Sequence, residues 1–402
     1  MSILIVKPNF NKIKQQLAFP AKSLNYFIES EIQDNFGFYQ QNFGIYSYMQ
    51  LTKNLKYVIH TLTGTPMLWQ PLNSCSWDPT GSMTMGRREF EPCRGKINES
   101  FCYDEFFDSC FEQFLTYNGR GPVQLDANGI DLVNSMVRTL GQNATLGARL
   151  TLTAGQLHDV ANLSFNEETS NDIQALFKKT AGTCKGWVEL VREMGEIPQY
   201  RHMNVPNLLP STDYNGKTYT GDVIELFDSL KDNATNDMQS LIAEGGIAGS
   251  VDGDFMPYMG VTMDIYKAAT AQYNEQCISV TCINPRMTRE EFQIPTRRGT
   301  RKLYVYYIDD VPIIPFPDIT YYDRFLTGMT SMAFITVGGN INLGASFAAL
   351  PDISESNIGI LVERATDVKE WGQYSFLAHS LFATTIADHS FFVGSQTYVE
   401  PA

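Results

Sequence analysis

The chain is poor in charged side chains. Asp, Glu, Lys and Arg make up 18% of its 402 residues, against about 25% in typical soluble domains. The charge is also one-sided, since 44 acidic residues against 30 basic ones leave a net charge of −14. This balance opposes general nucleic-acid binding, in which clustered Lys and Arg displace counterions from phosphates. Because surfaces that lose their water in protein contacts are depleted in charge, the low content indicates a subunit covered by neighbours.

Long apolar runs are missing as well. The longest, such as Met332–Leu350, are broken by Gly and Asn and fall short of the roughly 20 apolar residues of a membrane-spanning helix. The first six residues are apolar, but they lack a basic segment and end at Lys7-Pro8, so we expect no secretion signal. We therefore expect synthesis in a reducing cytoplasm and no membrane contact.

The cysteines and histidines show no spacing typical of a site. No Cys-x-x-Cys pair occurs among the seven cysteines, and such irregular spacing predicts neither a disulfide framework nor zinc. We expect Cys93, Cys102, Cys110, Cys277 and Cys282 to be buried free thiols. No Gly-x-Ser-x-Gly elbow, phosphate loop or dinucleotide fingerprint is present. The sequence thus predicts no catalytic residue, no cofactor and no metal.

One tetrapeptide has a catalytic counterpart. Tyr307-Ile308-Asp309-Asp310 matches the Tyr-x-Asp-Asp sequence with which reverse-transcriptase-like polymerases hold Mg²⁺. Such an enzyme also needs a basic template channel, which this acidic chain does not indicate. Asp-Asp before Val-Pro is more typical of a turn between strands. A Mg²⁺-dependent nucleotidyl-transfer enzyme using Asp309 and Asp310 stays the alternative of a different class.

The chain does contain helix and strand patterns in more than one core unit. Hydrophobic residues make up 43%, and a single core rarely grows past roughly 250–300 residues. Apolar periodicity and capping predict helices over Asn128–Gly155, Asn171–Met194, from a Thr220 N-cap onward, and over Thr262–Tyr273. β-rich runs predict strands over Leu303–Ile308, Ile358–Arg364, Tyr374–Ala387 and Ser390–Tyr398, with a Pro-dense break at Val311–Pro317. This order is typical of an α+β fold with mixed sheets.

The N-terminal third contains two unusual segments. The first 70 residues are rich in irregularly spaced aromatics, which indicates an arm lying on another surface or an ordinary N-terminal subdomain. Trp77–Pro92 then alternates polar and apolar residues, which predicts a β-hairpin about 30 Å long. A hairpin of this length cannot bury both faces on its own chain, so it needs a partner surface.

Basic residues gather at two places. They are Arg87, Arg88, Arg94 and Lys96 beside the hairpin, and Arg297, Arg298, Arg301 and Lys302 around Gly299. A solvated face is the ordinary interpretation of such runs. Contact with a neighbour's carboxylates is the alternative.

The order of these segments has a known counterpart. It runs from Met83-Thr84-Met85-Gly86-Arg87-Arg88 through Lys96–Cys102 and the long helix to Tyr307–Pro315 and Thr327-Gly328-Met329. In this order the chain resembles the major capsid proteins of tailed bacteriophages with the Hong Kong 97-type fold. The resemblance implies an N-terminal arm (1–70), an extended β-hairpin loop (71–97), a peripheral domain with a spine helix (98–219), an axial domain (220–352), and C-terminal strands that return to the peripheral domain (353–402).

The resemblance also implies a function. A major capsid protein self-assembles into hexamers and pentamers of an icosahedral head shell, enclosing the phage genome without specific DNA binding. It implies subunit contacts through Met83, Met85, Arg87, Arg88 and Phe90 of the hairpin and Arg297, Arg298 and Arg301 of the axial domain. Portal, scaffold or decoration proteins are the other expected partners, and no fused scaffolding domain is expected. An encapsulin-like compartment for an enzyme cargo has the same fold and stays an alternative.

Overall fold

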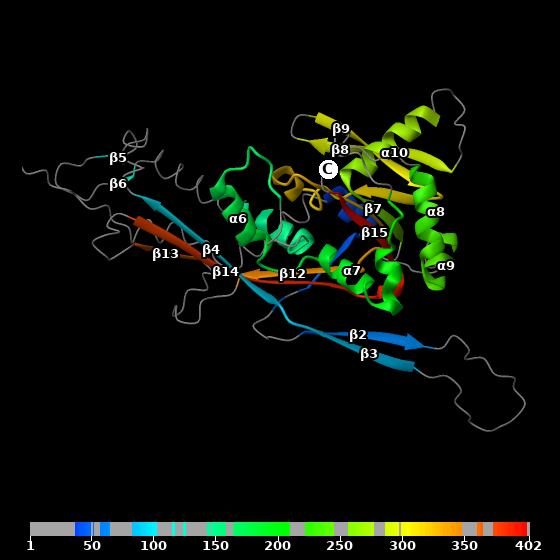
Figure 1. The fold of residues 1–402 in the computed structure, drawn as a ribbon, viewed down its shortest axis with the longest axis horizontal. Coiled ribbons are helices and arrows are strands. Elements are labelled where there is room, and N and C mark those ends of the chain that lie inside the picture. Colours follow the sequence, from blue (N-terminus) through cyan, green and yellow to red (C-terminus); the bar gives the residue numbers. More distant parts are fainter. Residues whose placement is uncertain are drawn as a thin grey trace, which may run out of the picture.

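The computed structural model describes residues 37–49, 51, 57–64, 83–102, 115–116, 124–125, 143–144, 146–157, 164–209, 222–244, 256–276, 286–296, 299–347, 360–364 and 373–399. Within these residues helices and strands are mixed, which confirms the predicted α+β class. The described strands form a six-stranded sheet, a five-stranded sheet and two two-stranded pairs, one of which is the ribbon of β2 (Tyr57–Gly64) and β3 (Met83–Phe90). Figure 1 shows the larger sheet within a body from which the five-stranded sheet and the ribbon extend.

The elements follow one another along the described chain. The α-helices are α3 (Gly37–Phe43), α6 (Asn171–Ala181), α7 (Trp187–Gly195), α8 (Val223–Asn233), α9 (Asn236–Glu244) and α10 (Met263–Gln276), and residues 146–154 are helical too. The short 3-10 helices are η2 (Pro198–Asn204), η3 (Tyr322–Phe325) and η5 (His389–Phe391). The strands are β1 (Tyr46–Tyr48), β2 (Tyr57–Gly64), β3 (Met83–Phe90), β4 (Cys93–Cys102), β5 (Leu115–Thr116), β6 (Gln124–Leu125), β7 (Pro257–Val261), β8 (Met287–Thr296), β9 (Gly299–Ile308), β10 (Val311–Pro315), β11 (Met329–Val337), β12 (Ile341–Phe347), β13 (Ile360–Arg364), β14 (Gln373–Ile386) and β15 (Phe392–Val399).

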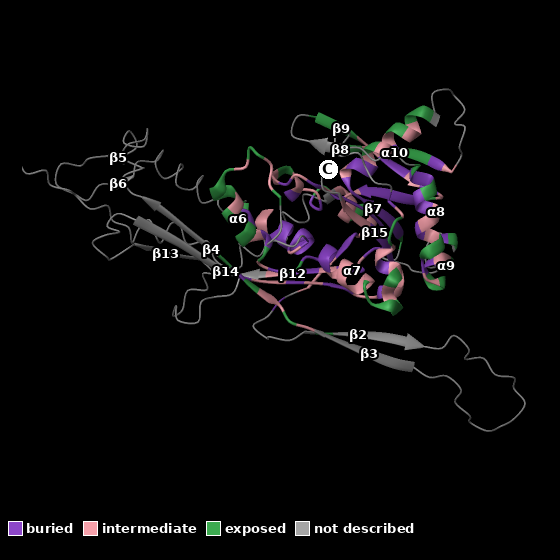
Figure 2. Cartoon of the chain, in the orientation of Figure 1, coloured by how far each residue is buried: buried purple, intermediate pink, exposed green. Residues whose placement is uncertain are grey.

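The six-stranded sheet is the middle layer of the body. Its order is β15-β11-β7-β10-β9-β8, and only β7 and β10 among its pairs run parallel. Successive side chains of a strand point to opposite faces, and both faces are apolar here: Met332 and Phe334 of β11 join one cluster, Ala333 and Ile335 the other. Helices α8, α9 and α10 cover the second face, at the right of Figure 1. Figure 2 shows the buried residues concentrated in this body.

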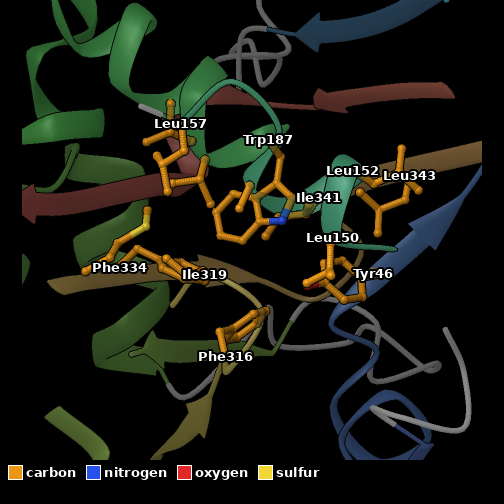
Figure 3. Close-up of a cluster of buried hydrophobic side chains, with 14 of the residues drawn as sticks. Tyr46, Leu150, Leu152, Leu157, Trp187, Phe316, Ile319, Phe334, Ile341 and Leu343 are labelled. Atoms are coloured by element: carbon orange, nitrogen blue, oxygen red, sulfur yellow. The ribbon is translucent and has the colours of Figure 1, made fainter. Parts of the chain in front are cut away.

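The opposite face carries the aromatic cluster, part of which is drawn in Figure 3. Its rings include those of Tyr46, Trp187, Tyr258, Phe316, Phe334 and Phe392. The ring of Phe334 lies 5.2 Å from that of Trp187 and 5.3 Å from that of Phe392, measured between centroids. On the neighbouring strands Phe334 is paired with Gly260 and Gly394. A Cβ at Gly260 would lie 2.1 Å from the Phe334 ring. Glycine at this position therefore makes room for the aromatic side chain.

The five-stranded sheet is built around β14. Strand β4 pairs along one edge of β14, while β13 and then β12 occupy its other edge. Strand β1 adds to β12 in parallel. The end that contains β4 and β13 extends from the body at the left of Figure 1. The other end is part of the body, because Ile341 and Leu343 of β12 pack in the aromatic cluster.

The ribbon corrects the predicted hairpin. Met83–Phe90 is a strand as expected, but it pairs with Tyr57–Gly64, which the prediction placed in the N-terminal arm. After a two-residue connection, Cys93–Cys102 leaves the ribbon and pairs with β14 in the five-stranded sheet. The hairpin is therefore not confined to 71–97. The alternation of Met83 and Met85 identified one strand, but a long connection hid its partner.

The helix predicted over Asn171–Met194 is interrupted. It forms α6 and α7, separated by residues 182–186. The backbone approaches another segment closely in this break, because a Cβ at Gly186 would lie 2.4 Å from the carbonyl oxygen of Thr153. Gly186 is also the N-cap of α7. The apolar periodicity continued through the break and concealed it.

Other predicted elements have mixed outcomes. The strands Leu303–Ile308, Ile358–Arg364, Tyr374–Ala387 and Ser390–Tyr398 are confirmed as β9, β13, β14 and β15, and Thr262–Tyr273 as α10. The Pro-dense break was wrong, because Val311–Pro315 is strand β10. The C-terminal strands separate: β15 pairs with β11 in the six-stranded sheet. Of the predicted Asn128–Gly155 helix, residues 128–142 lie outside the described part, and 146–154 are helical.

The start of α8 differs in one residue. Thr220 lies outside the described residues, and the N-cap is Asp222. The Asp222 carboxylate accepts hydrogen bonds from the backbone N–H groups of Ile224 at 2.8 Å and Glu225 at 3.2 Å. It satisfies donors that have no partner within the helix. The first turn was recognised, but the capping residue was placed two positions early.

The cysteine prediction was wrong at one position. Cys93 and Cys184, 91 residues apart, form a disulfide with their Cα atoms 5.9 Å apart. Cys93 is therefore not a free thiol. Cys102 lies on β4, and the remaining cysteines, Cys75, Cys110, Cys277 and Cys282, lie outside the described residues.

Candidate functional site

The base of the ribbon borders a hollow. Of the predicted hairpin contacts, Met83, Met85, Arg87 and Arg88 lie on β3, and their side chains are outside the described part of the structure. Phe90 at the end of β3 is half-buried and lines a pocket of about 500 Å³. The other walls come from α7, the α6–α7 connection and β14. The pocket thus lies where the ribbon joins the body.

The β8–β9 hairpin carries one of the predicted axial contact residues, Arg301. Arg301 is exposed on β9, opposite Ile294 of β8. Next to it, the Lys302 Nζ lies 2.8 Å from the Glu291 Oε1, and this hydrogen bond lowers the pKa of the Glu291 carboxyl. Arg297 and Arg298 lie outside the described residues. The structure therefore places only Arg301 of this group, on the exposed outer end of the hairpin.

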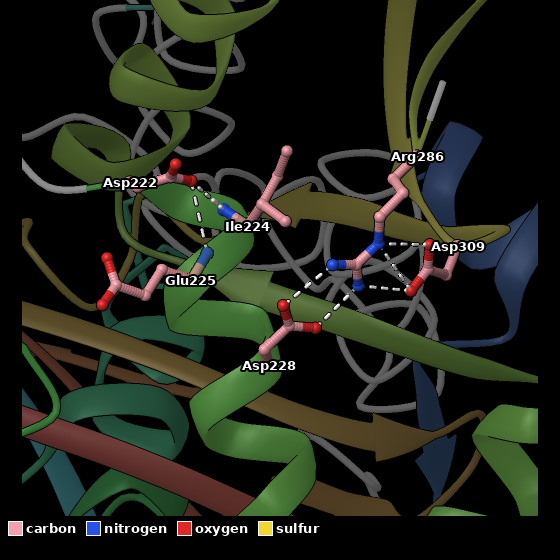
Figure 4. A network of polar contacts seen from close by, with 6 residues as sticks. All are labelled: Asp222, Ile224, Glu225, Asp228, Arg286 and Asp309. Atoms are coloured by element: carbon pink, nitrogen blue, oxygen red, sulfur yellow. Dashed lines mark hydrogen bonds and ion pairs between the residues drawn. The ribbon is translucent and has the colours of Figure 1, made fainter. Parts of the chain in front are cut away.

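The tetrapeptide Tyr307–Asp310 ends β9 and forms the turn to β10, as expected. Asp309 and Asp310 adopt positive φ angles of 47° and 65°, a conformation that Asp tolerates better than most residues. Figure 4 shows the Arg286 guanidinium between Asp309 and Asp228 of α8, with Nη2 2.6 Å from an oxygen of each. Hydrogen bonding from Arg286 lowers the pKa of Asp309. One carboxylate of the pair is thus bound by an arginine, which weakens the Mg²⁺-dependent alternative.

A buried ion pair joins the helical stretch 146–154 to the segment after β10. Arg149 donates through Nη2 to Asp318 Oδ1 at 2.8 Å, and its Nε lies 2.8 Å from Oδ2. The two residues are 9% and 2% exposed. Burial raises the pKa of Asp318, and the Arg149 charge opposes this shift. Because a buried charge without its partner is strongly unfavourable, the pair restricts how the two segments can move apart.

Two kinds of site are absent from the described residues, a membrane-spanning helix and a metal-binding cluster. No helix there combines the length and apolar character needed to cross a bilayer. Nor do His, Cys, Asp and Glu side chains of the described ranges gather into a group of three that could hold a metal ion.

The fold was compared with known proteins. No protein-family model matches the chain, and no curated protein matches its sequence. Among solved structures, the capsid of Ralstonia phage GP4 is similar over 90% of this chain and 91% of its own, with a TM-score of 0.43 and 9% identity. The satellite phage P4 procapsid, which includes the size determination (Sid) protein, is similar over 90% of this chain and 98% of its own, with a TM-score of 0.42 and 9% identity. A structure of Gordonia phage Cozz is similar over 88% and 85%, with a TM-score of 0.40 and 9% identity. The names of all three structures refer to phages or a satellite phage.

Several structurally important residues were not predicted. Arg149, Asp318 and Arg286 were missed because their partners are distant in the chain. No local spacing points to the Cys93–Cys184 pair either. For the break between α6 and α7, which contains Cys184, the sequence did offer a signal. Gly182 and Gly186 lie inside the helical pattern, and glycine there lowers the expectation of a continuous helix.

Proposed function

We propose that this chain is the major capsid protein of a tailed bacteriophage, a structural subunit rather than an enzyme. Copies of the chain form hexamers and pentamers that close into an icosahedral head around the genome. The subunit is made in the host cytoplasm and ends in the virion. Portal, scaffold or decoration proteins are its further partners. The acidic balance of 44 acidic to 30 basic residues fits a wall that encloses DNA without gripping it.

The β2–β3 ribbon carries this proposal. Its strands pair with each other and, among the described strands, with no other, and Figure 1 shows the ribbon standing off the body. A two-stranded ribbon alone is marginally stable in water, and Val58 on β2 is 37% exposed. The ribbon therefore needs a surface from another molecule. Repeated head-to-tail contacts between identical subunits supply one and close into rings.

Many weak contacts then suffice for a closed shell. Once one contact has formed, the next ones on the same subunit are effectively intramolecular. In this proposal Met83, Met85, Arg87, Arg88 and Phe90 contact the neighbour along the ribbon. Arg301 of β9, together with Arg297 and Arg298 shortly before it in the sequence, meets carboxylates of adjacent subunits near the centre of each ring.

Shortening the ribbon tests the proposal. Residues 61–86 are removed, and His60 is joined to Arg87, its partner across the ribbon, through an Asn-Gly turn. We expect an unchanged thermal unfolding transition but no closed particles in electron microscopy or sedimentation. The control, Lys179→Ala, changes an exposed side chain of α6 and is expected to assemble. Normal shells from the shortened chain would contradict the role of the ribbon, and a full-length chain that stays monomeric would contradict the shell itself.

Two further measurements test the contact through Arg301 and the contents of the shell. Arg301→Glu is expected to reduce the yield of shells, while Arg301→Lys keeps most of it, because only the first reverses the charge. Equal yields would remove Arg301 from the contact. Particles isolated from infected cells are expected to contain nuclease-protected DNA. A single enzyme cargo in its place would favour an encapsulin-like compartment.

A further inference from the structure

The Cys93–Cys184 disulfide links the base of the ribbon to the body. Cys93 opens β4, directly after the two residues, Glu91 and Pro92, that follow the ribbon strand β3. Cys184 lies in the connection between α6 and α7. The bond therefore fixes the point at which the chain turns from the ribbon into the five-stranded sheet.

The two sulfur atoms belong to residues that line a pocket open to solvent. The pocket of about 500 Å³ is lined by both cysteines, by Phe90 and Glu91 of the ribbon base, and by His389 among others. Cys184 itself is 3% exposed, and the hollow brings a small molecule next to the two residues that form the bond. Reactivity of a thiol or disulfide depends on such access.

The surroundings also accommodate the reduced pair. The Sγ of Cys93 lies 3.2 Å from the carbonyl oxygen of Thr183, so a free thiol there has an acceptor for its weak S–H donor. Cys184 is buried, an environment that suits a free thiol as a small apolar side chain. The pairing of β4 with β14 ends at Cys93, which is opposite Phe382, so loss of the bond frees this end while the nine other residue pairs hold the strand. Opening the bond thus removes one tether without removing the strand.

We propose that Cys93 and Cys184 form a redox-dependent clamp that sets the freedom of the ribbon. In a reducing cytoplasm both residues are thiols and the ribbon base hinges at Glu91 and Pro92. On exposure to a low-molecular-weight disulfide of the glutathione class, one thiolate attacks that disulfide and releases one small thiol. The second thiolate then displaces the other small thiol from the mixed disulfide. Two protein thiols and one small disulfide become one protein disulfide and two small thiols, and the clamp is closed.

The redox chemistry of the clamp does not depend on shell formation. Only its effect on assembled shells rests on the proposed function. An open clamp gives the ribbon freedom to find its partner surface, while a closed clamp restricts the separation of two segments 91 residues apart. Since the bond is local to one chain, its chemistry can be tested on unassembled protein. Failure to build shells leaves the test intact.

The test compares the unassembled chain equilibrated with reduced or with oxidised glutathione. Peptide mass spectrometry is expected to find Cys93 linked to Cys184 only in the oxidised sample. The oxidised chain is expected to unfold roughly 5–10 °C higher than the reduced chain, with slower hydrogen exchange over residues 90–95. Cys184→Ser is expected to abolish both differences. If that variant fails to fold, the comparison of the two redox states of the natural chain decides alone.

Three outcomes overturn the proposal. The linked peptide is absent after oxidation, the bond resists reduced glutathione in the folded chain, or the exchange rates over residues 90–95 are the same in both states. The second outcome makes the bond a permanent structural link, and the third makes it irrelevant to the ribbon.

Discussion

The two faces of the six-stranded sheet are built from different parts of the chain. The face under α8, α9 and α10 is mainly aliphatic, and its three helices come from one stretch of chain, residues 223–276, although α8 contacts the distant strands β11 and β15. The other face is aromatic and gathers Tyr46, Leu150, Trp187 and Phe316, which are spread over 270 residues of the chain. One face is covered by three consecutive helices, whereas the other is covered by segments from distant parts of the chain.

The two faces differ in how the segments that form them are held in place. Contacts close in sequence are formed at a low cost in loop-closure entropy, while distant segments need large buried groups and specific links. The aromatic face has both, because Trp187 is fully buried there and the Arg149–Asp318 pair ties two of its segments together. We therefore expect substitutions on the aromatic face to have the larger effects.

The largest effect is expected for Trp187→Ala. The side chain is 0% exposed and its ring contacts those of Phe316, Phe334 and Phe392. Its removal leaves a cavity and is expected to lower the free energy of unfolding by about 4 kcal/mol. Urea unfolding followed by circular dichroism measures the change.

Two control variants compare the aromatic face with the aliphatic face and with an exposed position. Leu230→Ala removes a fully buried side chain of the aliphatic face and is expected to cost less, about 3 kcal/mol. Leu176→Ala, at a position that is 62% exposed on α6, is expected to change the free energy of unfolding by less than about 0.5 kcal/mol. An equal loss at Trp187 and Leu230 would show that the two faces contribute alike.

The second effect concerns the buried ion pair. Arg149→Met leaves the Asp318 carboxylate buried without its partner and is expected to cost about 3 kcal/mol. The double variant Arg149→Met with Asp318→Leu is expected to recover most of this loss, since no buried charge remains. Chemical unfolding of the single and double variants measures the coupling. Losses that simply add would show that the two side chains do not act as a pair.

The same contrast explains what could be predicted from the sequence. Strand β9 and helix α10 were predicted because their patterns are local, and the Asp309–Asp310 turn because Asp tolerates its conformation. The β2–β3 pairing, the Cys93–Cys184 disulfide and the Arg149–Asp318 pair were missed. Each joins residues that no periodicity relates. The candidate contact residues Met83–Phe90 were correctly predicted to form a strand. The surface that this strand contacts stays a prediction.

A smaller effect is expected at the start of the aliphatic face. Asp222 caps α8 and also accepts a hydrogen bond from Gln272 of α10 at 2.6 Å. Asp222→Ala removes both interactions and is expected to cost about 1 kcal/mol. Asp222→Asn keeps a capping oxygen and is expected to retain most of the stability. Thermal unfolding compares the two variants, and an equal loss in both would assign the effect to charge rather than to capping.

The smallest effect depends on pH. Arg286 lowers the pKa of Asp309 in the folded chain, so the ionised carboxylate is favoured by folding. This contribution is complete above the unfolded value near pH 4 and is lost as the pH falls through the lower folded pKa. Because Arg286 and Asp309 are partly exposed, we expect less than about 1 kcal/mol. Asp309→Asn should therefore weaken the fall in stability below pH 4, measured by urea unfolding between pH 3 and 7.

The control for this prediction is Asp310→Asn, which removes a charge from the same turn but leaves the Arg286 bonds to Asp228 and Asp309 in place. If both variants flatten the acid limb equally, net charge rather than the Arg286 link between α8 and the β9–β10 turn is responsible.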